Sequence, residues 1–199
     1  MRQSSPSALR NRAPIADVLA RVLPTRAGAL VLEIASGSGE HVTFFAARFP
    51  SLTFQPSDPM EAARASVLAH SGELHLGNVL APLDLDVCAP WPIERADAIV
   101  CINMIHASPP ESGPALFSGA ARVLPPGAPL VTYGPYRMGG AHTAPSNEAF
   151  DRWLKTERDP RWGVRDLGDL EAHAASAGLV LEERVPMPAD NFTLIWRRV

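Results

Sequence analysis

Apolar residues along the chain follow the spacing of helices and of strands in turn. Ile15, Leu19 and Val22 share one face of a helix, and Pro24 ends that pattern. Similar spacing predicts five further helices, at residues 42–49, 60–69, 116–123, 147–155 and 170–177. Short apolar runs predict seven strands, at residues 29–34, 52–55, 83–87, 98–102, 130–133, 179–184 and 192–197. Because strands and helices alternate, we expect an α/β fold with a doubly wound, mostly parallel seven-stranded sheet.

The length of 199 residues fits one domain, and no repeat or shift in composition divides the chain. We therefore expect a single domain over residues 1–199. Within it, residues 134–166 are rich in glycine, proline and polar side chains. A connection of this length in a compact domain is usually a lid or a binding loop, so these residues are expected to cover a ligand.

Charge and composition narrow the choice of partners. The net charge of −3 and the pI near 6.1 predict no nucleic-acid partner. Cys88 and Cys101 lack metal-ligand spacing, so we expect no metal site and a reducing, cytoplasmic setting. The polar residues 1–11 predict no secretory signal, and no apolar run reaches the about 18 residues of a membrane helix. The expected partner is a small molecule, and the expected protein a monomer or homodimer.

A turn of small residues joins the first predicted strand to the next helix. It contains Glu33, Ala35, Ser36, Gly37 and Gly39. Glycine permits left-handed backbone and the close approach of a ligand, and doubly wound sheets bind ligands at the ends of their strands. Asp58 follows the next predicted strand, where a carboxylate can accept hydrogen bonds from both hydroxyls of a ribose. The pattern predicts a site for a nucleoside cofactor.

Two nucleoside cofactors fit this pattern, a dinucleotide and S-adenosyl-L-methionine (SAM). The dinucleotide motif G-x-G-x-x-G needs a third glycine, where this chain has Val42. Glu40 at the start of the helix would also repel a pyrophosphate. SAM carries a cationic sulfonium and an ammonium, so the acidic residues favour SAM, with S-adenosylhomocysteine as its product.

The same segments resemble the motifs of class I SAM-dependent methyltransferases. Residues 33–39 resemble their glycine-rich first motif, and Asp58 resembles their ribose-binding acidic residue. Asp86-Val87 resembles the position that meets the adenine amino group, and Asn103, Met104 and His106 match the segment that lines the sulfonium and the acceptor. The resemblance therefore implies a Rossmann-like methyltransferase fold with SAM as the cofactor.

The resemblance is closer still to one group, the methyltransferase-like "domain of unknown function 938" proteins, and it covers nearly the whole chain. Matching segments include residues 10–11, 55–58, 103–106, 133–136 and 187–189. It implies that Arg10 and Asn11, before the first helix, fold over the amino-acid end of the cofactor. The chain departs from the group's pattern at Asp190 and at Ser108-Pro109, near the expected acceptor pocket. The resemblance implies SAM binding and names no acceptor.

Catalytic and acceptor-binding roles fall on polar side chains after the fourth predicted strand and in or beside residues 134–166. His106 is either a general base toward an acceptor hydroxyl or a buried structural histidine, and Tyr133 is the second catalytic candidate. The candidates for binding the acceptor are Met104, His106, Tyr136, Asn147, Arg165 and Asn191. Arg165 in particular offers two parallel hydrogen bonds to a carboxylate.

Three functions fit these residues. The first is a methyltransferase that transfers the methyl group in line to oxygen, nitrogen or sulfur of a small molecule; a carboxylate or thiolate acceptor would need no base. The second is a SAM-binding protein without methyl transfer, either a cyclase, a lyase or a pseudoenzyme. The third is a nicotinamide-dependent oxidoreductase, against which the missing third glycine counts.

Overall fold

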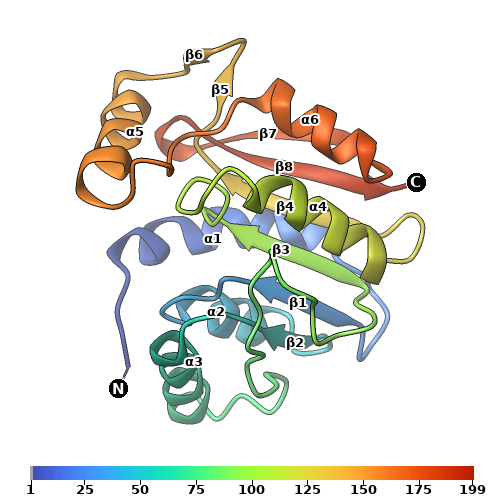
Figure 1. The fold of residues 1–199 in the computed structure, drawn as a ribbon. Coiled ribbons are helices and arrows are strands. Elements are labelled where there is room, and N and C mark those ends of the chain that lie inside the picture. Colours follow the sequence, from blue (N-terminus) through green and yellow to red (C-terminus); the bar gives the residue numbers. More distant parts are fainter. Residues whose placement is uncertain (1) are drawn as a thin grey trace.

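The structure, a computed structural model, describes residues 2–199, in which strands and helices alternate (Figure 1). The helices are α1 (Pro6–Val22), α2 (Glu40–Arg48), α3 (Glu61–Glu73), α4 (Ser112–Val123), α5 (Pro145–Glu157) and α6 (Leu167–Ser176), and Pro188–Asp190 is a 3-10 turn. The strands are β1 (Leu30–Ile34), β2 (Thr53–Pro56), β3 (Ala98–Ile102), β4 (Pro129–Gly134), β5 (Arg137–Met138), β6 (Ala141–His142), β7 (Leu179–Met187) and β8 (Asn191–Arg198). Within residues 2–199 no helix has the length and apolar character to cross a bilayer.

Six strands form the main sheet, in the order β2-β1-β3-β4-β8-β7. β2, β1, β3 and β4 are parallel neighbours, whereas β8 is antiparallel to both β4 and β7. β5 and β6 pair separately as a small hairpin. The predicted doubly wound, mostly parallel α/β fold is therefore confirmed.

The strand predicted at residues 83–87 is not formed, so the sheet has six strands and not seven. This part of the chain passes along the outer edge of β2 and makes two isolated bridges, Phe54 to Val79 and Ser57 to Leu83. Pro82 lies between them and has no N–H to donate, so a continuous ladder cannot form there.

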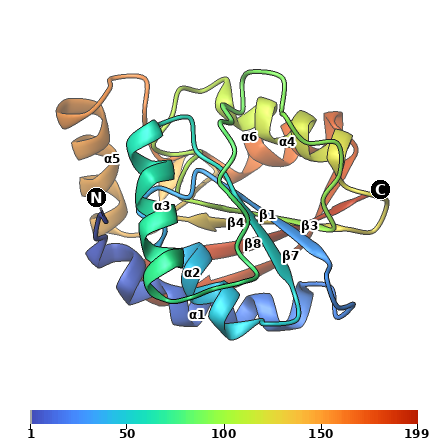
Figure 2. The same cartoon turned by 90° about the horizontal axis from the view of Figure 1, so that it is seen from below.

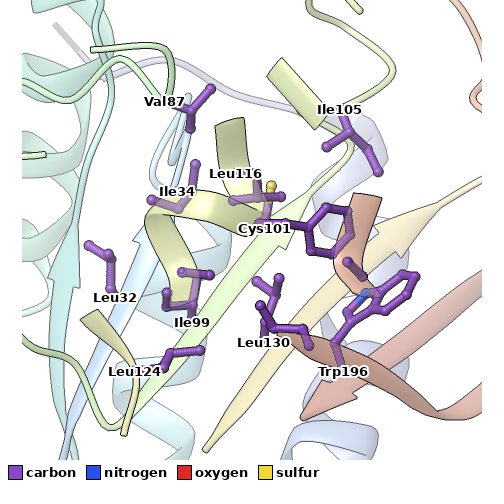
Figure 3. Close-up of a cluster of buried hydrophobic side chains, with 14 of the residues drawn as sticks. Leu32, Ile34, Val87, Ile99, Cys101, Ile105, Leu116, Leu124, Leu130 and Trp196 are labelled. Carbon is purple, nitrogen blue, oxygen red and sulfur yellow. The ribbon is translucent and has the colours of Figure 1, made fainter. Parts of the chain in front are cut away.

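Both faces of the sheet are buried, which explains why its central strands are apolar at nearly every position. Leu32 and Ile99 point to the face covered by α4 and α6, whereas Val31 and Val100 point to the face covered by α1 and α2. Figure 2 shows these two pairs of helices on opposite sides of the sheet. Figure 3 shows the first of the two clusters, in which Trp196 of β8 packs beside residues of β3 and β4.

Helix α1 begins earlier than the sequence predicts. The Ser5 side chain caps it by accepting a hydrogen bond from the Ala8 N–H at 3.3 Å, and Pro6 occupies the first turn, where a missing N–H costs nothing. Arg10 and Asn11 were expected before the first helix; they lie inside α1. A polar first half of this helix thus extends beyond the part that packs on the sheet.

Residues 134–166 lie beyond the carboxyl ends of β3 and β4 (Figure 1). They contain the β5–β6 hairpin, helix α5 and a return segment, residues 158–166. The Asp166 side chain closes this stretch, because it accepts hydrogen bonds from the N–H groups of Gly140 at 2.6 Å and Gly168 at 3.0 Å. These residues therefore form a folded layer over one edge of the sheet.

The fit between α4 and the loop before β3 leads to a test of stability. A Cβ at Gly119 would lie 2.1 Å from Cζ2 of the buried Trp91, so Gly119→Ala should lower the free energy of unfolding by about 1–3 kcal/mol, measured by urea denaturation. Gly113→Ala, in the same helix, meets only Leu170 at an ordinary 3.5 Å and should change stability by less than about 1 kcal/mol. Equal stability of both variants would contradict the packing.

Candidate functional site

A cavity of about 420 Å³, the first cavity, opens at the carboxyl ends of β1, β2 and β3. Doubly wound sheets bind their ligands at this edge. Six of the predicted site residues line it: Ala35, Asp58, Asp86, Val87, Asn103 and Met104. Apolar side chains such as Leu85 and Met60 complete much of the wall. The cavity therefore combines an apolar surface with two carboxylates and one amide.

The turn after β1 places three residues in the left-handed backbone region: Ala35 at φ 55°, Gly37 at 53° and Gly39 at 89°. Gly39 is the N-cap of α2, and a Cβ there would lie 3.0 Å from the Cα of Val67. Glycine is thus required at this position both by the dihedral angle and by the space. Ala35 lines the first cavity, whereas Ser36, Gly37 and Gly39 shape the turn without lining it.

The Asp58 carboxylate connects this turn to the end of β2. Its Oδ2 accepts the Gly37 N–H at 3.0 Å and its Oδ1 accepts the Met60 N–H at 2.9 Å. A second link runs parallel to it, because the Ser36 N–H donates to the Ser57 carbonyl at 2.8 Å. Asp58 is buried and yet lines the first cavity. Each of its oxygens has a further lone pair with which it can accept a ligand hydroxyl.

Glu33 is buried on β1 just before the turn, and it does not line the first cavity. Its Oε2 has no hydrogen-bond partner among residues 2–199. Burial raises the pKa of Glu33 to about 8, while a hydrogen bond with Ser36 acts in the opposite direction and the charge of Asp58 adds to the increase. The carboxyl is therefore mostly neutral at pH 7.

The loop between α3 and β3 brings Asp86 and Val87 to the wall of the first cavity. Asp86 Oδ1 accepts the Cys88 N–H at 2.9 Å, and the indole of Trp91 donates to the Val87 carbonyl at 3.2 Å. The loop is thereby anchored to the core. Trp162, in the return segment, also lines this cavity. Sequence reasoning missed it, although an aromatic residue within a polar loop was a signal that could have marked it.

A second cavity, of about 440 Å³, shares Asn103 with the first. Predicted site residues that line it are Arg10, Asn11, Asn103, Tyr133, Asn147 and Asn191, and residues that the prediction missed include Ser7, Pro135, Ser146 and Phe150. Of residues 2–199, no acidic, histidine, lysine or cysteine side chain lines it. Nowhere in the same range do three histidine, cysteine or acidic side chains gather so that they could hold a metal ion.

Asn103 lies directly after β3, where the two cavities meet. Its φ of 59° is in the left-handed region, which asparagine tolerates better than most residues. Its N–H donates to the Tyr133 carbonyl at 2.8 Å, and its carbonyl accepts the His106 N–H at 3.1 Å. The side-chain amide makes no hydrogen bond within residues 2–199, so it is available to a ligand.

The other asparagines of the second cavity use their side chains within the protein. Asn147 donates to the Asp190 carbonyl at 2.9 Å and so ties α5 to the turn between β7 and β8. Asn191 donates to two carbonyls of that turn. The Asn11 Oδ1 lies 2.7 Å from His41 Nε2. Asn147 and Asn191 were expected to bind an acceptor directly; both line the cavity, but they also hold its walls together.

His106 is fully buried and lines neither cavity. Its Nδ1 accepts the Arg165 N–H at 3.2 Å, and its ring packs edge-on against Tyr136 with the centroids 4.9 Å apart. Burial lowers the pKa of His106 to about 3, with the charge of Arg165 acting in the same direction. A general base must reach the acceptor. These contacts are those of a buried structural histidine, which is one of the two roles predicted from the sequence.

Arg165 and Tyr136 also lie outside both cavities. The Arg165 guanidinium donates to the carbonyls of Ile105, at 2.9 Å, and Ser108. Tyr136 is fully buried, and its hydroxyl donates to Thr132 Oγ1 at 3.0 Å. Both residues were expected to bind the acceptor; the structure uses them instead to fix the return segment and the core.

Several solved structures with a similar fold are methyltransferases. The mitomycin 7-O-methyltransferase MmcR matches with a TM-score of 0.80 and 17% identity, over 96% of this chain and 54% of its own. CalO1, a methyltransferase in calicheamicin biosynthesis solved with S-adenosylhomocysteine, gives 0.74 and 18%, over 97% and 54%. An O-methyltransferase family 2 protein from Planctomyces limnophilus, in complex with apigenin, gives 0.74 and 20%, over 100% and 63%. This chain thus spans little more than half the length of these proteins, and the likeness establishes the fold.

The fold is therefore that of the class I SAM-dependent methyltransferases, a Rossmann-like α/β sheet. The chain itself belongs to a particular family. The model described as "Protein of unknown function (DUF938)" matches residues 2–198. The resemblance noted from the sequence is therefore confirmed for the family and for the fold.

The buried Glu33 predicts a pH dependence of stability. The folded protein keeps the Glu33 proton up to about pH 8, whereas an unfolded chain releases it near 4.5. Between these values the unfolded state binds fewer protons, so stability falls as the pH rises, by up to about 1.4 kcal/mol per unit. Glu33→Gln removes this loss. Urea denaturation should show the variant gaining on the wild type from pH 5 to pH 8, while the exposed Glu171→Gln should follow the wild type.

The contacts of Arg165 predict a structural and not a ligand-binding effect. Arg165→Gln should lower the free energy of unfolding by about 2–3 kcal/mol, because carbonyls of the loop after β3 lose charged donors. Arg161→Gln is a matched control: its exposed guanidinium bonds mainly to the neighbouring Asp159, so the variant should keep nearly the stability of the wild type. If Arg165→Gln were as stable as the wild type, the structural role would be refuted.

Proposed function

We propose that this protein is a SAM-dependent methyltransferase that acts on a small molecule. The observation that carries the proposal is the meeting of two cavities at Asn103, with the glycine turn and Asp58 beside the first. The first cavity would hold the nucleoside of SAM and the second the acceptor. The sulfonium methyl would then lie near Asn103, at the boundary between them.

The chemistry of the first cavity suits SAM. Asp58 would accept the two ribose hydroxyls, while Asp86 and the apolar residues Leu85 and Val87 would bind the adenine. When the cationic cofactor binds nearby, its positive charge would lower the pKa of Glu33 and favour the ionised carboxylate. The solved methyltransferase CalO1 binds S-adenosylhomocysteine on the same fold, which supports this assignment.

Methyl transfer needs alignment more than acid or base groups. The acceptor atom attacks the methyl carbon opposite the sulfur, and the cofactor supplies the reactivity. Holding the reacting atoms about 3–3.5 Å apart contributes several kcal/mol of barrier lowering. Asn103, Tyr133 and the folded layer of residues 134–166 would position the acceptor and exclude water. The complex of a solved relative with apigenin, a small molecule, supports an acceptor of this size class.

Two other functions are separable from this one. A SAM-binding protein without methyl transfer would bind the cofactor equally well and would form no methylated product. A nicotinamide-dependent oxidoreductase would bind NAD. The acidic Glu40 at the start of α2 disfavours a pyrophosphate there, and so does the absence of a third glycine.

Calorimetric titration with SAM, S-adenosylhomocysteine and NAD tests the cofactor. We expect micromolar binding of the first two and no comparable binding of NAD. Asp58→Asn and Asp58→Ala should weaken SAM binding at least about tenfold, because hydrogen bonds to a charged group contribute about 1.5–3 kcal/mol each. Asp84→Ala is the control, since the exposed Asp84 side chain pairs with Arg64 and lines neither cavity. Tighter binding of NAD than of SAM would refute the proposal.

A further inference from the structure

The second cavity has an unusual balance of charge and titratable groups. Arg10 is its only lining residue among residues 2–199 that is charged at neutral pH, and its guanidinium makes no hydrogen bond or ion pair within that range. The remaining polar lining consists of asparagine, serine and tyrosine side chains. Arg10 is exposed to solvent, so the lining carries one solvated positive charge and, within residues 2–199, no negative one. An unpaired positive charge in a cavity favours an anionic ligand.

Three lining residues of the second cavity carry hydrogen-bond donors: Arg10, Asn103 and Tyr133. The Asn103 amide is unpaired within residues 2–199. Burial raises the pKa of the Tyr133 hydroxyl, although Asn11 and the Arg10 charge oppose the increase, so this hydroxyl stays protonated and can donate. All three residues offer N–H or O–H groups to a ligand in this cavity, and Asn103 also lines the first cavity, near which the methyl group would lie.

No acidic, histidine, lysine or cysteine side chain of residues 2–199 lines the second cavity, so no lining side chain can take a proton from an acceptor at neutral pH. Asp58 and Asp86 line only the first cavity. Two histidines contact lining residues without lining the cavity themselves: His41 at Asn11, and His106 at Asn103. Burial lowers the pKa of His41 to about 4 and that of His106 to about 3, so both are weak bases. An alcohol, a phenol or an ammonium group would keep its proton here and remain a poor nucleophile.

We propose that the acceptor is a small carboxylic acid, which the protein converts to its methyl ester, with Arg10 and Asn103 as the residues that receive the carboxylate. This inference rests on the proposed methyltransferase function. One carboxylate oxygen forms a bond to the methyl carbon, the bond from sulfur to that carbon breaks, and its electron pair stays on sulfur. An anion and a cation give a neutral ester and a neutral thioether. No proton moves, so the absence of a base costs nothing.

The reaction has a product that is easy to recognise. Alkali hydrolyses a methyl ester and releases volatile methanol, whereas methyl ethers, amines and thioethers retain their methyl group. The full chain is incubated with SAM tritiated in the methyl group and with benzoate, hexanoate, benzyl alcohol or benzylamine, or with the low-molecular-mass fraction of a cell extract. We expect label that alkali releases as methanol, from an acid of the panel or from the extract.

SAM carries a carboxylate of its own, so an effect of Arg10 on acceptor binding must be distinguished from an effect on cofactor binding. Variants of α1 make this distinction. Arg10→Gln should lower the initial rate at limiting acceptor at least tenfold and leave the dissociation constant of SAM within twofold. Arg10→Lys should recover part of the rate, since it keeps the charge. Arg21→Gln is the matched control on the same helix, because Arg21 is exposed and pairs with Glu183 far from the cavity lining.

Three outcomes would overturn the inference, and they differ in what else they affect. Label that is stable to alkali would refute ester formation while leaving the methyltransferase function intact. A weakened SAM affinity in Arg10→Gln, with an unchanged rate at limiting acceptor, would assign Arg10 to the carboxylate of the cofactor. SAM binding without transfer of label to any compound would refute the methyltransferase function itself, and this inference with it.

Discussion

The hydrogen bond from the Gly37 N–H to the Asp58 carboxylate joins the ends of two neighbouring strands, although the two residues are 21 positions apart in the sequence. It fixes the turn after β1 against the end of β2, and the wall of the first cavity follows from that geometry. The same carboxylate has lone pairs left for a ligand. Its charge also adds to the raised pKa of Glu33. The Glu33 carboxyl is therefore mostly neutral at pH 7.

A second set of contacts holds the return segment, residues 158–166, which contributes Trp162 to the wall of the first cavity. The return segment is pinned to the loop after β3 by the Gly163 N–H, which donates to the His106 carbonyl at 2.9 Å, and by Arg165. The His106 ring fills the space beside Gly134, where a Cβ would lie 2.5 Å from Nε2. The buried histidine thus sets the distance between β4 and the loop. The layer over the sheet edge and the strands beneath it form one packed unit.

The sequence predicted the fold and the first cavity well because both depend on local patterns. The strand–turn–helix unit at residues 30–48 and the acid at Asp58 occur in a fixed order along the chain. The second cavity was harder, because its lining comes from α1, β4, α5 and the β7–β8 turn. Spacing does not reveal which of two polar residues points inward. Arg165 and His106 were predicted to be functional for that reason, whereas the structure buries His106 and gives both residues contacts with the backbone.

The two cavities also differ in which parts of the chain build them. The first depends on the ends of central strands, where glycine dihedral angles and backbone bonds tolerate few substitutions. The second is walled largely by α1, α5 and the β7–β8 turn, which lie outside the central strands, and only Asn103 is common to both. Substitutions in those outer segments would alter one binding surface and spare the other. Under the proposed function, proteins that descend from a common ancestor would then differ in their acceptor while they keep the same cofactor.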